Sequence, residues 1–448
     1  MGRLFGTDGV RGIANKDLTG QLAYELGRIG SHIVTKGKKK AKIIVGMDTR
    51  KSGDLLESAL IAGICSVGAD AYSVGIVPTP AVAYLTRKYE ADAGIVISAS
   101  HNPVEYNGIK FFNSKGYKLS DEIEDEIESY ILAQKDIDVY PVGEFVGEKI
   151  IVNDGVEQYI EYIKQSIDVD FKGIKIAVDC GNGANYQAAP ELLRELGADI
   201  DVIYNEPNGL NINVECGSTK PEKVQNLVLE TKADIGLAFD GDADRLIAVD
   251  EKGNIVDGDH ILAICGLLLK EQGKLEHGKI VGTVMSNMGL EICLKEHGMG
   301  LVTTQVGDRY VLEEMTRSGY VLGGEQSGHI IFSDHNTTGD GLLTALQLIS
   351  AIKKKEKPLS ELADVMTVYP QVLVNAKVQE GNKHNYLEDQ IIHDEIKRLE
   401  SEFDGKGRVL IRPSGTEPLV RVMIEGEVYG EIKAAADALA HTIEERLS

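Results

Sequence analysis

Residues 93–103 read Ala-Gly-Ile-Val-Ile-Ser-Ala-Ser-His-Asn-Pro, an apolar run that ends in hydroxyl, imidazole and amide groups. The apolar run predicts the end of a buried strand, and α/β proteins commonly place reactive groups on the loop that leaves such a strand. Ser100 beside His101 indicates an activated hydroxyl. The structural alternative is that Asn102-Pro103 merely starts a turn and that Ser100 caps a following helix.

Around this stretch, apolar strand-like runs alternate with amphipathic helical segments. Residues 42–45 predict a strand, 55–67 a helix and 71–74 another strand. The same pattern starts again at residues 174–179 and at 279–284. This alternation predicts an α/β protein with parallel or mixed sheets.

A second loop carries three carboxylates at alternate positions. Residues 239–245 read Phe-Asp-Gly-Asp-Ala-Asp-Arg between two apolar runs. Asp240, Asp242 and Asp244 can converge on one cation only if the backbone turns sharply, and we expect Gly241 to permit that turn. Carboxylate oxygens select Mg²⁺, Mn²⁺ or Ca²⁺, and the flanking strands argue against an EF-hand. The alternative is an acidic surface turn.

A third loop combines glycines with polar side chains. Residues 323–329 read Gly-Gly-Glu-Gln-Ser-Gly-His after an apolar run at 320–322. Glu, Ser and His offer donors and acceptors on an exposed loop, as the hydroxyl groups of a sugar require. A plain glycine-rich turn with a capping glutamate is an equally good interpretation of this loop alone.

A fourth loop has the composition of an anion cradle. Residues 412–418 read Arg-Pro-Ser-Gly-Thr-Glu-Pro between strand-like runs at 408–411 and 419–423. Backbone N–H groups, hydroxyls, Arg412 and Arg421 can bind phosphate oxygens. The loop lacks the Gly-Lys-Ser/Thr ending of a Walker A motif. A simple hairpin whose arginines face solvent is the alternative.

Composition limits the class of partner and the compartment. The 448 residues suggest three or four domains, and the net charge of −23 opposes general binding to nucleic acid. The five cysteines are scattered, so neither a disulfide framework nor a zinc site is expected. The N-terminal residues show no signal-peptide core, and the longest apolar stretch, 261–269, is too short to cross a bilayer. We therefore expect a cytoplasmic protein.

Taken together, the four loops closely resemble those of the α-D-phosphohexomutase superfamily, in the same order and spacing. The resemblance begins at residues 5–12, Phe-Gly-Thr-Asp-Gly-Val-Arg-Gly, and extends over essentially the whole chain. It is strongest for members that act on glucosamine phosphates, because of Gln326 and of Gly-Asp-Arg-Tyr at 307–310. Two positions depart from the usual pattern: Ala243 stands where a glycine is common, and Met47 replaces a common arginine.

The resemblance implies three related α/β domains with mixed sheets and a smaller C-terminal α+β domain, surrounding a central cleft. The predicted domains are 1–147 with the phosphoserine loop, 148–252 with the metal-binding loop, 253–367 with the sugar-binding loop, and 368–448 with the phosphate-binding loop. In the last domain, the sequence after residue 370 predicts strand, helix, strand, hairpin loop, strand and helix.

The resemblance also implies a reaction: interconversion of glucosamine 6-phosphate and glucosamine 1-phosphate through a 1,6-bisphosphate, for amino-sugar nucleotide and cell-wall precursor synthesis. It implies that phosphorylation of Ser100 is required for activity and that one Mg²⁺ per active site is held by Asp240, Asp242, Asp244 and the phosphorylated Ser100. Arg11 and Arg245 are expected to assist the transfer. Either Lys110 or His101 is the general base, although each has a simpler interpretation, as a phosphate contact and as an orienting hydrogen bond respectively.

The implied substrate contacts come from the third and fourth loops: Glu325, Ser327, His329, Arg412, Ser414, Gly415, Thr416 and Arg421. The implied partner is a small sugar phosphate, with no nucleic acid and no membrane, and a homodimer is possible. The alternatives are a phosphomannomutase or phosphoglucomutase with the same site, a metal-dependent sugar-phosphate phosphatase, and a non-catalytic sugar-phosphate sensor.

Overall fold

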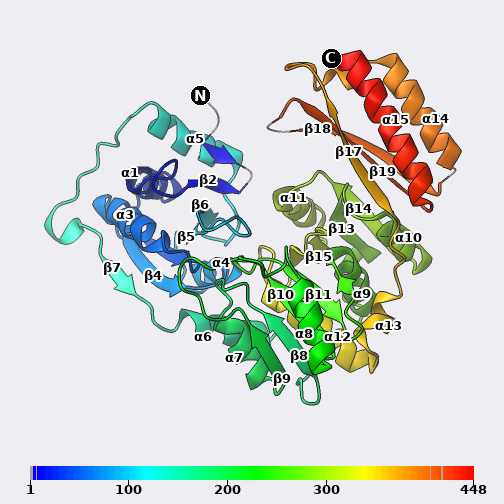
Figure 1. Cartoon of the computed structure of the whole chain (residues 1–448). Coiled ribbons are helices and arrows are strands. Elements are labelled where there is room, and N and C mark those ends of the chain that lie inside the picture. Colours follow the sequence, from blue (N-terminus) through cyan, green and yellow to red (C-terminus); the bar gives the residue numbers. More distant parts are fainter. Residues whose placement is uncertain (1–3, 7, 404, 415–416) are drawn as a thin grey trace. The chain divides into compact units, whose positions relative to one another are not determined.

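A computed structural model describes residues 4–6, 8–403, 405–414 and 417–448 (Figure 1). The chain forms two compact units. The first unit comprises Met1–Thr283 and Val302–Val365, and the second comprises Val284–Leu301 and Met366–Ser448. Because the second unit takes residues from two separate segments, the chain passes into it twice.

The first sheet of unit 1 has seven strands in the order β1-β2-β6-β5-β3-β4-β7. Its strands are β1 (Phe5–Gly6), β2 (Gly9–Ile13), β3 (Lys42–Met47), β4 (Asp70–Ile76), β5 (Ala93–Ile97), β6 (Tyr106–Asn113) and β7 (Lys149–Ile151). Its helices are α1 (Gly20–Glu25), the π-helical η1 (Leu26–Gly30), α2 (Ser31–Val34), α3 (Gly53–Ser66), α4 (Thr79–Lys88), α5 (Asp121–Leu132) and the 3₁₀ turn η2 (Gly143–Phe145). The sheet is mixed, because β3 pairs in parallel with β4 and β5, whereas β5 pairs antiparallel with β6.

The apolar runs of the sequence explain this layer. All five residues of β5 are buried, as expected for a central strand covered on both faces. The expected helix at 55–67 is α3, and its buried Leu56, Leu60 and Ile64 recur at helical spacing and share a core with the strands. The loop after β5 is therefore held at the end of a well-packed strand.

The second sheet has the order β12-β11-β10-β8-β9. Its strands are β8 (Lys175–Asp179), β9 (Asp199–Ile203), β10 (Ile235–Phe239), β11 (Leu246–Asp250) and β12 (Ile255–Val256), and its helices are α6 (Gly155–Lys164), α7 (Ala188–Glu195) and α8 (Glu222–Thr231). β10 lies parallel to β8 and antiparallel to β11, so the carboxylate loop is the turn between β10 and β11.

The third sheet has the order β14-β13-β15-β16. Its strands are β13 (Lys279–Thr283), β14 (Gly300–Thr304), β15 (Leu322–Gly324) and β16 (Ile330–Phe332). The helices of this region in unit 1 are α9 (Gly258–Glu271), the 3₁₀ turn η3 (Glu276–Gly278), α11 (Asp308–Ser318), α12 (Gly341–Lys355) and α13 (Leu359–Ala363). The glycine-rich loop connects β15 to β16, which pair antiparallel.

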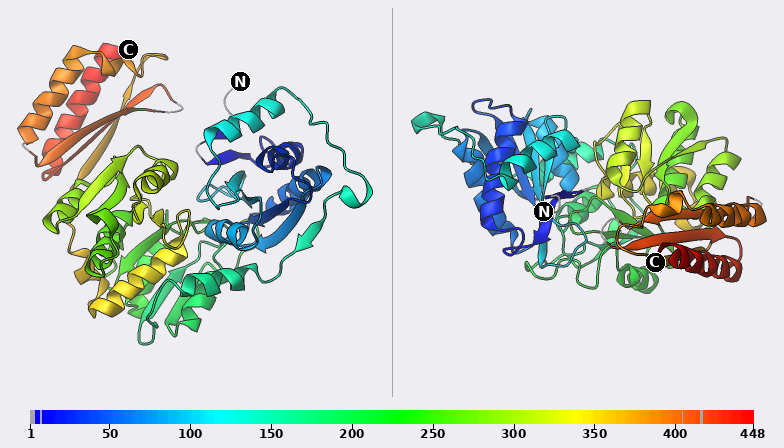
Figure 2. Two further views of the ribbon diagram at one scale, coloured as in Figure 1. Left: turned by 180° about the vertical axis from the view of Figure 1, so that it is seen from behind. Right: turned by 90° about the horizontal axis from the view of Figure 1, so that it is seen from above.

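Unit 2 contains α10 (Met288–Glu296) and a small α+β layer. The layer consists of β17 (Gln371–Lys377), the 3₁₀ turn η4 (Asn385–Leu387), α14 (Gln390–Phe403), β18 (Gly407–Pro413), β19 (Leu419–Gly426) and α15 (Tyr429–Leu447). The antiparallel sheet has the order β17-β19-β18, and α14 and α15 lie side by side against it (Figures 1 and 2). This succession of elements confirms the prediction for the chain after residue 370.

The predicted fold class is confirmed by the three α/β sheets and the small C-terminal α+β layer. The predicted domain boundaries remain predictions. Among the described residues, no helix is long and apolar enough to cross a membrane. All five cysteines are free, and four of them are buried.

Candidate active site

Ser100 lies on the loop that leaves β5, as its position in the sequence predicts. Its side chain is buried, and its backbone is in the left-handed region at φ 50°. The next regular element is strand β6, so the alternative in which Ser100 caps a helix is wrong. The Ser100 Oγ donates a 2.6 Å hydrogen bond to Oδ2 of Asp240, from the loop after β10. The strand ends of two sheets thus bring the predicted nucleophile to the predicted metal loop.

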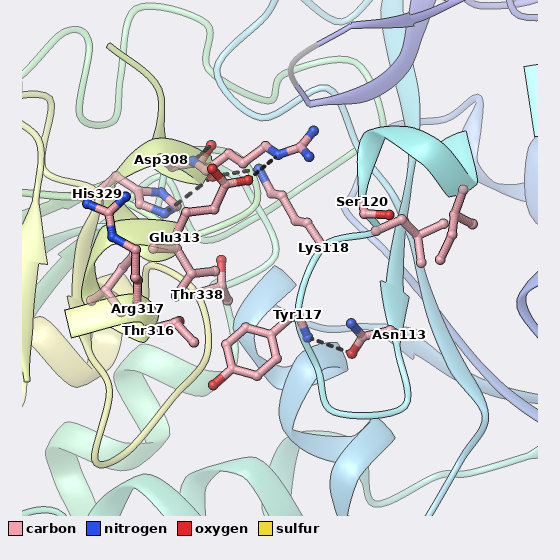
Figure 3. A pocket seen from close by; sticks show the side chains of 15 residues that line it. Asn113, Tyr117, Lys118, Ser120, Asp308, Glu313, Thr316, Arg317, His329 and Thr338 are labelled. Atoms are coloured by element: carbon pink, nitrogen blue, oxygen red, sulfur yellow. Dashed lines mark hydrogen bonds and ion pairs between the residues drawn. The ribbon is translucent and has the colours of Figure 1, made fainter. Parts of the chain in front are cut away.

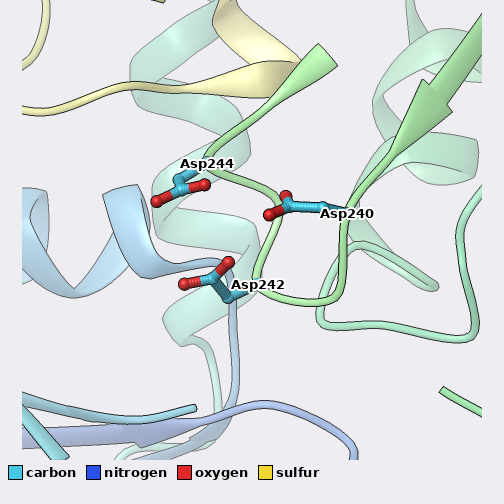
Figure 4. A group of neighbouring side chains, drawn as sticks. All are labelled: Asp240, Asp242 and Asp244. Carbon is cyan, nitrogen blue, oxygen red and sulfur yellow. The ribbon is translucent and has the colours of Figure 1, made fainter. Parts of the chain in front are cut away.

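The three aspartates of that loop turn their carboxylates toward one another (Figure 4). All three are buried, and one ligand oxygen from each lies within 4.8 Å of the others. Within the described part of the chain, Oδ1 of Asp242 and Oδ1 of Asp244 are buried without a hydrogen bond. Burial and the neighbouring carboxylates of Asp244 and Asp242 raise the pKa of Asp240 well above its usual value. Orphaned, mutually repelling carboxylate oxygens are the donor set that a hard divalent cation fits.

Gly241 and Ala243 shape the loop differently from the sequence-based expectation. The left-handed residue is Ala243, with φ 59°, and not Gly241. Gly241 is required by a close approach, because a Cβ at this position would lie 2.5 Å from the carbonyl oxygen of Ser100. Its missing side chain therefore lets the metal loop pack directly on the serine loop.

Lys110 reaches the same carboxylates from the middle of β6. Its ammonium group is buried and lies 2.9 Å from Oδ2 of Asp242 and 2.9 Å from Oδ2 of Asp8. Burial acts to lower the pKa of Lys110, but the carboxylates of Asp242 and Asp8 outweigh it and hold the pKa above its usual value. With these partners, Lys110 is a charged ammonium group that donates hydrogen bonds, and its raised pKa does not favour a role as general base.

His101 and two arginines line the other side of the serine. The Nδ1 atom of His101 lies 3.4 Å from Ser100 Oγ and 3.1 Å from Nη1 of Arg245. Nη1 of Arg11, from β2, donates a 3.4 Å hydrogen bond to Oδ1 of Asn102. Burial and the charges of Arg245 and Arg11 lower the pKa of His101, so its imidazole is neutral at pH 7 and can accept a proton.

A chain of ion pairs connects this centre to the third sheet. Lys118 Nζ lies 2.7 Å from Oδ1 of Asp8 and 2.5 Å from Oδ2 of Asp308. His329 continues the chain, 3.5 Å from Asp308 through Nε2 and 3.5 Å from Asp244 through Nδ1. Figure 3 shows Lys118 meeting Asp308 beside His329, at the wall of a cavity of about 420 Å³. Sequence reasoning gave no role to Asp8 or Lys118, because no local pattern indicates that these two residues meet.

The third loop is less exposed than predicted. β15 spans Leu322–Gly324, so the first two glycines of the loop belong to the strand. His329 is buried, with its Nδ1 facing the carboxylate of Asp244. Ser327 is exposed, whereas Oε1 of Glu325 accepts a 3.1 Å hydrogen bond from the backbone N–H of Gly307. The expectation of an exposed loop is therefore wrong for His329, because the carboxylates of Asp244 and Asp308 hold its side chain in a buried position.

In unit 2, the predicted phosphate loop connects β18 to β19. Arg412 and Arg421 are direct cross-strand partners, and burial together with Arg421 lowers the pKa of Arg412. Lys383 donates a 2.9 Å hydrogen bond to the carbonyl oxygen of Ser414, and Nε of Arg421 is buried without a hydrogen bond to any described residue. Like charges directly opposite in a sheet are unfavourable unless an anion lies between them. Gly415 and Thr416, predicted to bind phosphate, lie outside the described residues.

Known proteins resemble the chain over its full length. Family models described as phosphoglucomutase/phosphomannomutase match α/β/α domain I at residues 2–138, domain II at 157–253, domain III at 257–369, and the C-terminal domain at 373–442. A protein of Alkaliphilus oremlandii named phosphoglucosamine mutase is 62% identical over 449 residues, covering 100% of both chains. A protein of Caldanaerobacter subterraneus with the same name is 62% identical over 448 residues, again covering 100% of both.

Solved structures share the fold. A phosphoglucomutase/phosphomannomutase family protein of Burkholderia thailandensis superposes with a TM-score of 0.81 at 25% identity, covering 99% of this chain and 97% of that one. The N-acetylphosphoglucosamine mutase of Aspergillus fumigatus, in complex with GlcNAc-6P and magnesium, gives a TM-score of 0.70 at 19% identity, covering 99% and 96%. At that identity the second likeness shows the fold alone.

Proposed function

The chain belongs to the phosphoglucomutase/phosphomannomutase family, and from that premise we propose that it interconverts glucosamine 6-phosphate and glucosamine 1-phosphate. The family confirms the resemblance drawn from the four loops. The amino-sugar substrate is supported by full-length relatives at 62% identity that are named phosphoglucosamine mutase. The observation that carries the chemistry is the buried Ser100 hydroxyl, hydrogen-bonded to one of three converging carboxylates.

In the proposed reaction Ser100 carries the phosphoryl group between turnovers. The bond from phosphorus to Ser100 Oγ breaks as a bond to the sugar O1 hydroxyl forms, and the O1 proton passes to a base. The 1,6-bisphosphate then turns so that its O6 phosphoryl group faces Ser100. The bond from phosphorus to O6 breaks as a bond to Ser100 Oγ forms, and O6 regains a proton. Glucosamine 1-phosphate leaves with no net release of phosphate.

The carboxylates of Asp240, Asp242 and Asp244, together with phosphorylated Ser100, would hold one Mg²⁺. When bound, this cation supplies positive charge to the phosphoryl group during transfer. The fit rests on the orphaned oxygens of Asp242 and Asp244, which are buried and accept no hydrogen bond from a described residue.

The side chains around Ser100 supply positive charge and a proton acceptor for the phosphoryl transfer. Arg11 and Arg245 place positive charge beside the loop, and Arg245 also contacts His101. The neutral imidazole of His101 can take a proton, whereas the raised pKa of Lys110 keeps this side chain a charged hydrogen-bond donor, so we assign the general base to His101.

The remaining predicted residues bind substrate in this proposal. The sugar hydroxyls are bound by Glu325, Ser327 and His329, and the phosphate that does not react is bound by Arg412, Ser414, Gly415, Thr416 and Arg421. The adjacent arginines of β18 and β19 support the phosphate assignment. We further propose a cytoplasmic enzyme whose partner is a sugar phosphate rather than nucleic acid or membrane, because the free cysteines fit a reducing compartment and the net charge of −23 repels polyanions.

Turnover of glucosamine, glucose and mannose 6-phosphates, measured side by side, tests this function. Glucosamine 6-phosphate should give the highest kcat/KM, and the other two should react weakly because the phosphate contacts are shared. Equal or faster turnover of mannose 6-phosphate would replace the proposed substrate but keep the mutase chemistry. Stoichiometric release of inorganic phosphate would instead identify a phosphatase.

A further inference from the structure

The side chain of Arg50, between β3 and α3, is completely buried beneath the serine loop. A guanidinium group has five N–H donors in one plane, and in Arg50 five hydrogen bonds use them. Nε donates to Oδ2 of Asp48 at 2.9 Å. Nη1 and Nη2 donate to four carbonyl oxygens, those of Pro103 at 2.6 Å, Tyr106 at 3.1 Å, Ser100 at 2.9 Å and Asn102 at 2.8 Å. One side chain therefore holds the whole turn from β5 to β6.

The conformation of Ser100 needs such support. A serine at φ 50° is in the left-handed region, which L-residues other than glycine, asparagine and aspartate rarely adopt. Besides Arg50, the Nδ2 of Asn213 donates a 2.8 Å hydrogen bond to the Ser100 carbonyl oxygen. The missing Cβ of Gly241 leaves room for that same oxygen. Three separate segments thus fix the direction of one carbonyl.

The backbone N–H of Ser100 is tied to the same circuit. It donates a 2.9 Å hydrogen bond to Oγ of Ser98, and Ser98 Oγ donates a 2.6 Å hydrogen bond to Oδ2 of Asp48. Asp48 in turn accepts from Arg50, which donates back to the Ser100 carbonyl oxygen. Both polar backbone groups of Ser100 therefore belong to one closed loop of buried hydrogen bonds.

We propose that Arg50 is a positioning residue for phosphoryl transfer: it holds Ser100 in the left-handed conformation that aims its Oγ at Asp240. The inference rests on the proposed function but adds to it, because Arg50 touches neither the serine hydroxyl nor a predicted metal ligand side chain. It acts on Ser100 through the backbone carbonyl and N–H groups of that residue. A lysine keeps the charge but cannot donate to Asp48 and four carbonyl oxygens from one plane.

Arg28 offers a matched control within the same unit. Its side chain is also buried, and it makes five hydrogen bonds, to Oδ1 of Asp136, to O and Oγ of Ser66, and to the carbonyl oxygens of Ile137 and Val139. The segment that it holds supplies none of the residues proposed for the active site. Arg28→Lys therefore imposes a similar structural loss without touching the serine loop.

The experiment compares Arg50→Lys, Arg28→Lys and wild-type full-length protein. Each is incubated with glucosamine 1,6-bisphosphate, and intact mass gives the phosphorylated fraction. Steady-state turnover of glucosamine 6-phosphate is then expressed per phosphorylated site. Arg50→Lys should lower this kcat by about 10- to 100-fold, as expected when a reacting atom is displaced by about 1 Å, and leave KM nearly unchanged. Arg28→Lys should lose thermal stability but keep wild-type kcat per site.

Equal kcat per site in the two variants, or an Arg50→Lys enzyme as fast as wild type, would overturn the inference. If Arg50→Lys does not fold, Asn213→Gly replaces it, because glycine adopts the φ of 58° at this position freely. This variant removes the second donor to the Ser100 carbonyl oxygen, together with a 3.3 Å hydrogen bond to the carbonyl oxygen of Asn102 in the same loop. An unchanged kcat in Asn213→Gly would then show that the anchoring of the Ser100 carbonyl oxygen does not affect the transfer, and would overturn the inference. Failure of the proposed function is seen separately, as absent turnover by the wild-type protein.

Discussion

The hydroxyl of Ser100 donates a 2.6 Å hydrogen bond to a carboxylate oxygen of Asp240, 140 residues further along the chain. The two residues follow β5 and β10, which belong to different sheets. Both side chains are buried, so little water competes for the contact. The phosphoryl carrier and the cation ligands of the proposed enzyme therefore form one unit, and changes on either side are expected to affect the same step.

The first prediction concerns the phosphoryl carrier. Purified wild-type protein should contain a fraction that is heavier by one phosphate, because the buried Ser100 hydroxyl donates a hydrogen bond to one of the three converging carboxylates. Ser100→Ala should lose that fraction and all mutase turnover. Intact-mass analysis with peptide mapping checks both points, and Ser98→Ala tests whether a neighbouring hydroxyl substitutes. Phosphate on another residue, or a fully active Ser100→Ala enzyme, would show that the carrier has been misidentified.

The second prediction concerns the cation. Mg²⁺ should raise the melting temperature of the wild-type protein, because a ligand at 100 times its Kd stabilises the folded state by about 2.7 kcal/mol. Asp242→Asn should lose most of this increment, and chelation should stop wild-type turnover until Mg²⁺ is restored. Asp250→Asn is a suitable control, because Asp250 is a buried carboxylate that caps a turn outside the cluster. Its Mg²⁺ response should survive, and equal responses in both variants would contradict the assigned site.

The strands around the reactive loops could be predicted because apolar residues run continuously through them. The apolar runs before the serine loop and before the carboxylate loop predict strands, and these strands are β5 and β10. Local patterns also located Ser100 and Asp240, because reactive loops follow strand ends. The conformation of Ala243 was not predictable in this way, because a left-handed alanine is tolerated only when tertiary contacts impose it.

Contacts between distant segments could not be predicted from the sequence for a different reason. Lys118 forms ion pairs with Asp8 and Asp308. The three residues come from three separate parts of the chain, and no local sequence pattern predicts that they meet. The pairing of Arg412 with Arg421 depends on strand register, which the hairpin loop and the buried face set together. The sequence indicates which residues carry the chemistry, whereas packing decides which of them meet.

The third prediction is a pH dependence of stability that comes from Asp179. Its carboxylate accepts 2.8 Å hydrogen bonds from the backbone N–H groups of Gly181 and Gly217, and burial raises its pKa to about 6. An unfolded aspartate has a pKa of about 3.9, so between these values the folded state holds a proton that the unfolded state has lost. Wild-type stability from this group should therefore fall as pH rises, by about 1.4 kcal/mol per pH unit between about pH 4 and 6.

Asp179→Asn should lack this contribution, because an amide does not ionise. Denaturant unfolding of both proteins at pH 5 and pH 7 gives the change, and the free-energy advantage of wild type over the variant should be smaller at pH 7. Asp199→Asn, at an exposed position of β9, should show no such change in its difference from wild type. A difference between wild type and Asp179→Asn that stays constant with pH would mean that Asp179 is ionised when folded at both pH values.

The last prediction concerns the phosphate loop of unit 2. Arg421 faces Arg412 across the β18–β19 ladder, so a bound phosphate would relieve the repulsion between two like charges. Hydrogen bonds to a charged group contribute roughly 1.5–3 kcal/mol, or roughly 10- to 150-fold in affinity. Arg421→Ala should raise KM by about that factor, with little loss of stability. It should also release free 1,6-bisphosphate, because the intermediate must be recaptured by the same contacts after each transfer. Steady-state kinetics and a direct assay for the bisphosphate check both effects, with Arg446→Ala on α15 as a control that should change neither. An unchanged KM and no released intermediate in Arg421→Ala would show that this loop is a hairpin turn without a role in binding.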